Sequence, residues 1–271
     1  MSSDKFIDIR KLISSKSPKL VKWIPGFVIS YLKRILHEDE INNFLVKNVD
    51  LRNQEFCQGV VDYFDIEIYG YNLHHIPKTG PVIIVMNHPL GGMDAMALVT
   101  ALRKHRTDLK FIVNDLLMNL ENLKDLFVGV NKHGKNDGSV RQQISDLFGS
   151  EQAVCIFPAG LVSRKTKGII KDPVWKKTFV TYARNYDRLV IPVHIEGRLS
   201  NFFYRLSNFR KFIGIKANIE MLYLSDEMFR QRGKKINFVA GEPFYIKDLP
   251  EMTDQETAQI IKERVYALHS N

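Results

Sequence analysis

Residues 82–99, VIIVMNHPLGGMDAMALV, decide how this chain is organised. The stretch begins with five apolar residues, four of them β-branched, which is typical of a strand covered on both faces. It continues through Asn87-His88-Pro89 and two glycines to Asp94, which opens an apolar helical segment. A strand, a tight turn and a helix predict one unit of an α/β sheet, and ligands of such sheets bind at the carboxyl ends of the strands. The turn with His88 and Asp94 is therefore the first candidate site.

The chain after residue 60 repeats this alternation of strand and helix. The pattern predicts strands at 65–70, 81–87, 109–114, 153–160, 188–197, 217–224 and 236–246, and helices at 94–106, 116–127, 139–148, 173–185 and 252–268. Thr253 and Glu256 form a capping box at the start of the last helix. Such alternation predicts an α/β fold with a mixed, mainly parallel central sheet flanked by helices.

The first 60 residues have a different texture, with helical segments broken at Pro18 and Pro25. We therefore expect an N-terminal helical segment at 1–60 and an α/β domain at 61–271. Within the first segment, WIPGFVISYL at 23–32 lies between basic residues and places Trp23, Phe27 and Tyr31 at helical spacing. This segment is predicted either to lie in a lipid interface or to pack as an amphipathic helix on its own domain.

The composition limits which partners and which cellular compartment fit this chain. Thirty-nine basic and thirty acidic residues give a net charge of +9, which favours a polyanionic partner such as a nucleic acid, an anionic membrane or a phosphorylated substrate. The polar N-terminus does not match a signal peptide, and no run reaches the roughly 18 apolar residues of a spanning helix. Cys57 and Cys155 form no C-x-x-C pair, so we expect both to be reduced in a reducing compartment.

His88 and Asp94 are the candidate catalytic pair. An ionised aspartate at the start of a helix can orient the imidazole, so that its other nitrogen faces outward as a base. No G-x-S-x-G motif supplies a nucleophile, which favours direct deprotonation of an acceptor hydroxyl or amine over covalent catalysis. Backbone amides near Gly91 and Gly92 are candidates for stabilising the oxyanion.

Three other predicted strand ends carry polar chemistry: GVNKHGKND at 129–137, FPAGLVSRKTKG at 157–168 and IPVHIEGRLS at 191–200. The first resembles a phosphate-binding loop but has Asn136 where a magnesium-binding hydroxyl is needed, which argues against nucleotide hydrolysis. The histidines lack metal-ligand spacing, so no metal site and no bound cofactor are expected. A basic rim around His88 is predicted, suited to a phosphate or phosphopantetheine tail, from Lys132, Lys135, Arg164, Lys165, Lys167 and Arg198.

The blocks NHPLGGMD, GVNKHGKND, FPAGLVSR and VIPVHIEG, in this order over residues 62–245, resemble those of the lysophospholipid and glycerolphosphate acyltransferase superfamily. They look most like its bacterial hemolysin-like branch, which includes acyltransferases of ornithine and glycine lipids. The resemblance implies that His88 is the general base and Asp94 its partner. It further nominates for acceptor binding Lys132, Lys135, Gly160, Ser163 and Arg164.

Three features depart from the superfamily pattern. Five residues separate His88 from Asp94 where four are usual, and the two glycines could absorb the extra residue. Ala159 replaces the usual glutamate of the third block, and the second block lacks its arginine. These departures leave acyl transfer as the predicted reaction but weigh against lysophosphatidic acid as the acceptor.

The combined prediction is a bacterial acyltransferase of membrane lipid synthesis, cytoplasmic and peripherally associated with the inner membrane. It would move a fatty acyl group from acyl carrier protein or coenzyme A to a lysophospholipid or a lyso-amino-acid lipid. Two alternatives stay open at this point. A non-catalytic lipid-binding or adaptor protein would fit the drifted blocks, and a nucleic-acid-binding protein would fit the charge but lacks a recognisable module, so no nucleic-acid partner is expected.

Overall fold

The computed structural model describes residues 6–16, 23–114, 118, 120–130 and 138–269. The chain forms two compact units: one consists of Arg52–Leu199 with Arg232–Asn271, and the other of Met1–Leu51 with Ser200–Gln231. The predicted division at residue 60 separated a membrane-contacting segment from a catalytic domain, and that functional division stays a prediction. The compact units differ from it because they group Ser200–Gln231 with the N-terminal helices.

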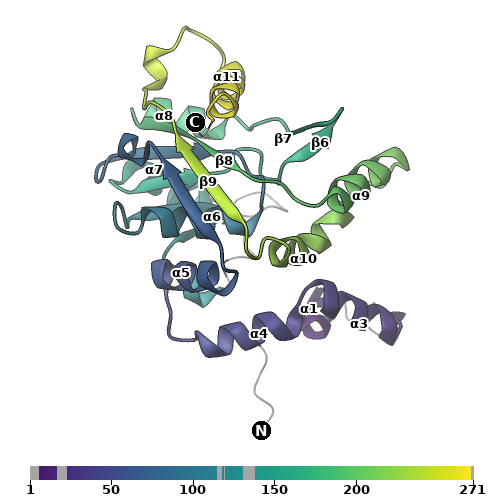
Figure 1. Ribbon diagram of the computed structural model, residues 1–271. Helices are drawn as coiled ribbons and strands as arrows, with labels where there is room; N and C mark the ends of the chain where they lie inside the picture. The colour runs from purple at the N-terminus through teal and green to yellow at the C-terminus, as the bar shows by residue number, and fades with distance from the viewer. Residues whose placement is uncertain (1–5, 17–22, 115–117, 119, 131–137, 270–271) are drawn as a thin grey trace. The chain divides into compact units, whose positions relative to one another are not determined.

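The larger unit is built on a central sheet, which has seven strands in the described residues (Figure 1). In spatial order these are β1 (Glu67–Tyr71), β9 (Lys235–Ala240), β8 (Leu189–Glu196), β2 (Val82–Met86), β5 (Ala153–Ile156), β3 (Leu109–Asn114) and β4 (Phe127–Val130). Neighbouring strands are parallel except β8 and β9, which pair antiparallel. The predicted mixed, mainly parallel sheet is confirmed.

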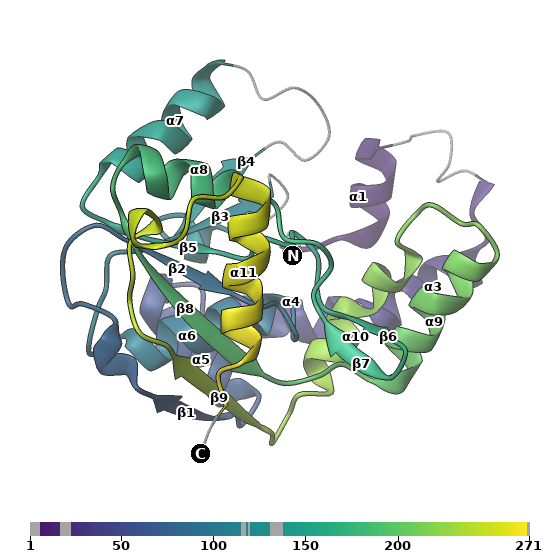
Figure 2. The same cartoon turned by 90° about the horizontal axis from the view of Figure 1, so that it is seen from above.

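Helices cover both faces of this sheet (Figure 2). On one face lie α7 (Gly138–Gly149), α8 (Thr178–Asn185) and α11 (Asp254–Tyr266); on the other lie α5 (Asn53–Tyr63) and α6 (Gly92–Leu102). A core cluster joins Ile83 and Val85 of β2 to Phe179 of α8 and Ile261 of α11. All five residues of β2 are buried, which explains their uninterrupted apolar character.

Short elements complete the larger unit. These are the 3₁₀ helices η1 (Leu73–His75), η3 (Glu121–Leu123) and η5 (Ile246–Asp248), and a hairpin of β6 (Arg164–Thr166) and β7 (Ile169–Lys171). Cys57 and Cys155 are free and buried. The capping box predicted for the last helix is present, since Thr253 accepts from the Glu256 amide and the Glu256 side chain accepts from the Thr253 amide.

The second unit is helical in its described residues. It contains α1 (Ile9–Lys16), α3 (Gly26–Ile35), α4 (Glu38–Lys47), α9 (Asn201–Phe212), η4 (Ile219–Tyr223) and α10 (Leu224–Phe229). His37 links its two chain segments, because its imidazole lies 3.2 Å from the Asp226 carboxylate and stacks on Phe229. In the parts of the chain that the structure describes, no helix has both the length and the apolar character needed to span a bilayer.

Two of the predicted elements differ from the structure. The strand predicted at 217–224 is wrong: these residues form η4 and the start of α10, in which Glu220 turns inward to pair with Arg210 of α9. The helix predicted at 116–127 is wrong in its described part, which forms η3 and then enters β4. The hairpin β6–β7 was not predicted, because strands of three residues carry too little periodicity to be recognised.

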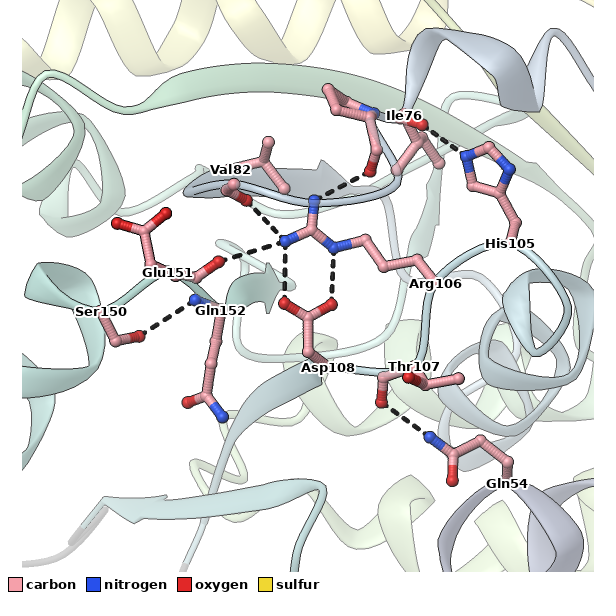
Figure 3. Close-up of polar contacts among 12 residues, drawn as sticks. Gln54, Ile76, Val82, His105, Arg106, Thr107, Asp108, Ser150, Glu151 and Gln152 are labelled. Carbon is pink, nitrogen blue, oxygen red and sulfur yellow. Dashed lines mark hydrogen bonds and ion pairs between the residues drawn. The ribbon is translucent and has the colours of Figure 1, made fainter.

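Arg106 connects the loops at the amino-terminal ends of the central strands (Figure 3). Its side chain is fully buried and forms a two-pronged ion pair with Asp108, at 2.7 and 2.9 Å. The same guanidinium donates to the carbonyls of Pro77, Gly80 and Glu151, which lie in loops before β2 and β5. One side chain therefore satisfies three backbone acceptors and one carboxylate.

Replacing Arg106 with methionine is expected to lower the free energy of unfolding by about 3 kcal/mol, because it leaves buried acceptors and the Asp108 charge without a donor. Urea unfolding measures this value. Arg184 serves as the matched control, since its ion pair with Asp254 is partly exposed. Arg184→Met should cost less than about 1 kcal/mol. Equal losses in the two variants would contradict the anchoring role of Arg106.

Candidate functional site

His88 is the second residue after β2, at the carboxyl end of the central strand of the sheet. After β2 the chain continues to β3, toward the β4 edge of the sheet. After the neighbouring β5 the next strand of this sheet is β8, which lies toward the opposite edge. The gap between the ends of β2 and β5 is therefore a topological switch point, where open α/β sheets bind ligands. Asn87 fixes the exit of β2, since its side-chain amide pairs with both the N–H and the carbonyl of Ile195, at 2.7 and 2.8 Å.

The imidazole of His88 contacts the carboxylate of Asp94, with 2.9 Å between Nδ1 and Oδ2. The same carboxylate oxygen accepts the backbone N–H of Leu90 at 2.9 Å. Gly91 has φ 71° and ψ −136°, a conformation open mainly to glycine, and it turns the chain into α6. With five residues between them in the sequence, the His88 and Asp94 side chains are in contact in the structure.

The environment of Asp94 sets the state of His88. Asp94 is completely buried, and this burial raises the pKa of its carboxyl above the ordinary value, opposed by its hydrogen bonds to His88 and Leu90. A desolvated carboxylate is a strong acceptor, so it favours the tautomer of the ring with a proton on Nδ1. That tautomer, assigned from the hydrogen bond, leaves Nε2 as the basic nitrogen. The ring stacks on Phe157 after β5, at 4.2 Å, and its side chain keeps 18% of its surface exposed.

Asp172 was not among the predicted site residues, yet it organises the backbone around His88. It lies after β7, is buried, and its Oδ1 accepts the backbone N–H of His88 at 3.2 Å and the hydroxyl of Ser163 at 2.6 Å. Its Oδ2 accepts the indole N–H of Trp175 at 2.9 Å. One carboxylate thus ties together the histidine turn, the third sequence block and the start of the segment leading into α8.

Helix α11 holds the Asp172 backbone in turn. The Asp172 N–H donates to the Tyr266 hydroxyl at 2.7 Å, and the Lys262 ammonium donates to the Asp172 carbonyl at 2.8 Å. Burial lowers the pKa of Lys262 and raises that of Tyr266, consistent with their enclosure. A sequence signal existed in D172-P-V-W175, an acid in front of a buried aromatic segment, but nothing local links it to a turn 84 residues earlier.

The third block meets the first directly. The Ser163 N–H donates to the His88 carbonyl at 2.8 Å. Gly160 lies in the preceding turn with φ 63°, and its surface is exposed. Arg164 is buried and its guanidinium donates to the Val162 carbonyl at 2.7 Å. Ala159, at the position of the usual glutamate, is buried in the core cluster.

The structure describes only some of the other predicted site residues. Gly92 is exposed at the first position of α6, and Arg198 is exposed just after β8. Lys132 and Lys135 lie outside the described residues. The structure therefore brings together His88, Asp94 and Ser163, and it leaves the basic rim a prediction. Among the residues it describes, no three histidine, cysteine or acidic side chains gather in an arrangement that could hold a metal ion.

His194 in β8 is a structural histidine, since its Nδ1 lies 3.1 Å from the Val265 carbonyl of α11. Burial lowers its pKa below the ordinary value, with the nearby Glu196 charge opposing the shift. The folded state therefore binds fewer protons than the unfolded state in the window below the unfolded pKa of about 6.5. Protonation in this window favours the unfolded chain.

The free energy of unfolding is expected to fall as the pH drops below about 6.5, and His194→Gln should flatten this slope. Urea unfolding between about pH 7.5 and pH 5 measures both proteins. The slope that remains in His194→Gln is the contribution of all other titrating groups to the pH dependence of the free energy of unfolding. An unchanged slope in the variant would contradict the assignment.

The comparisons with known proteins show to which family the chain belongs. The acyltransferase family model matches residues 11–271, and the chain belongs to this family of enzymes. The acyltransferase superfamily predicted from the four sequence blocks is confirmed.

Two curated relatives cover nearly the whole chain. One is the lyso-glycine lipid O-acyltransferase of Bacteroides thetaiotaomicron, 42% identical over 97% of this chain and 97% of its own length. The other is the lyso-glycine lipid O-acyltransferase of Phocaeicola vulgatus, 42% identical over 97% of this chain and 95% of its own length. Among solved structures, the 1-acyl-sn-glycerophosphate acyltransferase of Thermotoga maritima aligns with a TM-score of 0.47 at 17% identity, covering 90% of this chain and 94% of that chain.

Proposed function

We propose that this enzyme transfers a fatty acyl group from a thioester of acyl carrier protein or coenzyme A to the hydroxyl of a lyso-glycine lipid. The observation that carries the proposal is the 2.9 Å contact between His88 Nδ1 and Asp94, which leaves Nε2 as a base. The acceptor is inferred from the two relatives with 42% identity over 97% of the chain.

In the proposed reaction His88 acts as general base. Nε2 takes the proton of the acceptor hydroxyl while the hydroxyl oxygen attacks the carbonyl carbon of the thioester. Asp94 stabilises the imidazolium that forms. The carbon–sulfur bond then breaks, the leaving thiolate takes the proton back from the imidazolium, and the products are an ester and a thiol. No acyl-enzyme forms, and His88 returns to its starting state.

The turn after β2 supplies the other features of the proposal. The first N–H groups of a helix have no partner within that helix. Because Gly91 and Gly92 open α6, their amides are suited to stabilise the oxyanion. For the charged parts of donor and acceptor we propose a set of binding residues, namely Lys132, Lys135, Gly160, Ser163, Arg164 and Arg198.

The third block supports an acceptor other than lysophosphatidic acid. The side chain at position 159 is a methyl group in the apolar core, so the block presents no carboxylate at this position. An enzyme with this block is expected to discriminate between acceptors differently from members that carry the glutamate.

We further propose that residues 1–60 bring the enzyme to the cytoplasmic face of the membrane, and that residues 61–271 carry catalysis. Trp23, just before α3, is 85% exposed, Phe27 of α3 is 76% exposed, and Tyr31 of α3 is also exposed. These three side chains are here called the N-terminal stripe. The exposed side chains favour a lipid contact over packing on the domain, and Arg34 adjoins them.

A competition assay tests the proposed acceptor. The purified enzyme receives a radiolabelled palmitoyl thioester with equal amounts of lyso-glycine lipid, lyso-ornithine lipid and lysophosphatidic acid. We expect the label mainly in glycine lipid, in a linkage that mild alkali cleaves as an ester. Label mainly in phosphatidic acid, or in an alkali-stable amide, would contradict the proposed acceptor or the O-acylation.

A further inference from the structure

The end of α9 and the turn after it expose a cluster of large apolar side chains, here called the apolar tip. The tip consists of Phe209, Phe212, Ile213 and Ile215, and Phe212 is 87% exposed. Contiguous exposed apolar patches mark interaction sites, whereas single exposed apolar residues need no explanation. The N-terminal stripe was predicted from the sequence, whereas this segment was not.

The tip is held in shape from inside. Arg210 is buried, pairs with the buried Glu220, and donates to the Ile215 carbonyl at 3.1 Å and to the Asn218 side chain. The Ile215 N–H returns a bond to the Arg210 carbonyl at 2.9 Å. Gly214, with φ 77°, lets the chain reverse. A buried ion pair thus specifies the turn, while the apolar side chains point outward.

The charge around the tip selects one kind of partner. Residues 198–219 contain five basic and no acidic side chains. Arg210 is neutralised by Glu220, while Lys211 and Lys216 are exposed on both sides of Phe212 and Ile213. Apolar side chains flanked by lysines fit the boundary between headgroups and acyl chains of an anionic bilayer, where basic residues are attracted to the lipid charge.

We propose that the apolar tip inserts into the headgroup region of an anionic phospholipid surface, as a second membrane contact beside the N-terminal stripe. The proposal deepens the proposed function, on which it rests, because a lyso-lipid acceptor is met at such a surface. A second copy of this chain is the less suitable occupant. A two-fold contact would bring the lysines of both copies together, and like charges oppose such a contact.

Vesicle co-sedimentation tests the proposal with the full-length protein. Wild-type enzyme should sediment with vesicles of phosphatidylglycerol and phosphatidylethanolamine, and much less with phosphatidylcholine alone. The double variant Phe212→Ser/Ile213→Ser should bind the anionic vesicles about tenfold or more weakly. Ile260→Ser is the matched control, since Ile260 is an exposed apolar residue of α11 in the other unit, and it should bind like the wild type.

A fluorescent label provides a second, independent measurement. Cys57 and Cys155 are buried, and burial raises the pKa of Cys57 to about 12, so a thiol-reactive dye labels Phe212→Cys selectively. Vesicles should shift the emission of the dye to the blue, whereas a dye at the exposed Thr79→Cys in the other unit should not respond.

The proposal is overturned if the double variant binds vesicles as tightly as the wild type, or if the dye at position 212 does not respond. It is also overturned if light scattering shows a wild-type dimer that the double variant dissociates. Acyl transfer to detergent-dispersed lyso-lipid separates this proposal from the proposed function, because the tip variants should retain it. If the wild-type protein binds vesicles but transfers no acyl group, the proposed function is refuted and the proposed lipid contact is not.

Discussion

Replacing His88 with alanine is expected to lower acyl transfer by about a hundred- to ten-thousand-fold, because a positioned general base contributes rate enhancements of this size. The substitution removes the only atom that the proposed mechanism uses to move a proton. The side chain is partly exposed, so its loss should not unfold the protein. Initial rates with a radiolabelled thioester and saturating acceptor measure the effect.

His75 provides a matched control. Its side chain is 17% exposed, close to the 18% of His88, and it also contacts a carboxylate, that of Glu242 at 3.2 Å. His75→Ala should retain the wild-type rate, and added imidazole should restore part of the activity of His88→Ala. A folded His88→Ala protein with wild-type transfer would contradict the base assignment.

Converting Asp172 to asparagine should lower kcat about a hundredfold, since a displacement of the reacting group by about 1 Å has effects of this order. An amide has one oxygen, whereas the carboxylate accepts from His88 and Ser163 on one side and from Trp175 on the other. The amide NH₂ therefore faces a donor on one side, and a bond to the histidine turn or to the indole must break. KM should change little, because Asp172 acts on the position of His88.

Removal of the indole donor distinguishes positioning from a general structural loss. In the double variant Asp172→Asn/Trp175→Phe, the NH₂ group faces the place of the former indole N–H. The amide oxygen again accepts from His88 and Ser163. The double variant should therefore regain part of the kcat lost in Asp172→Asn, although its unfolding free energy falls further because Trp175 is fully buried. Losses of kcat that simply add would indicate a merely structural role.

The parts of the fold that could be predicted are those specified by local patterns. The apolar run of β2, the glycines before α6 and the capping box of α11 each carry a strong local signal, and each element was found. Residues 217–224 alternate like a strand but form helical turns. Their conformation depends on the pairing of Glu220 with Arg210 of α9, which no local pattern reveals.

The same distinction applies to the candidate site. His88 and Asp94 are six positions apart on one turn, so their contact could be anticipated from the sequence. Asp172 reaches His88 only because the β6–β7 hairpin returns the chain to the end of β2. The Ser163 hydroxyl donates to the same carboxylate, a contact that the sequence did not indicate. Such long-range closure requires the three-dimensional structure.

We propose that this protein moves an acyl group to an acceptor instead of merely binding lipid or hydrolysing a thioester. The most direct test measures thiol release and ester formation in the same reaction, with palmitoyl thioester and lyso-glycine lipid. We expect one thiol for each ester, with negligible thiol release when the acceptor is omitted. Release without acceptor, or no release from a folded protein that binds lipid vesicles, would contradict it.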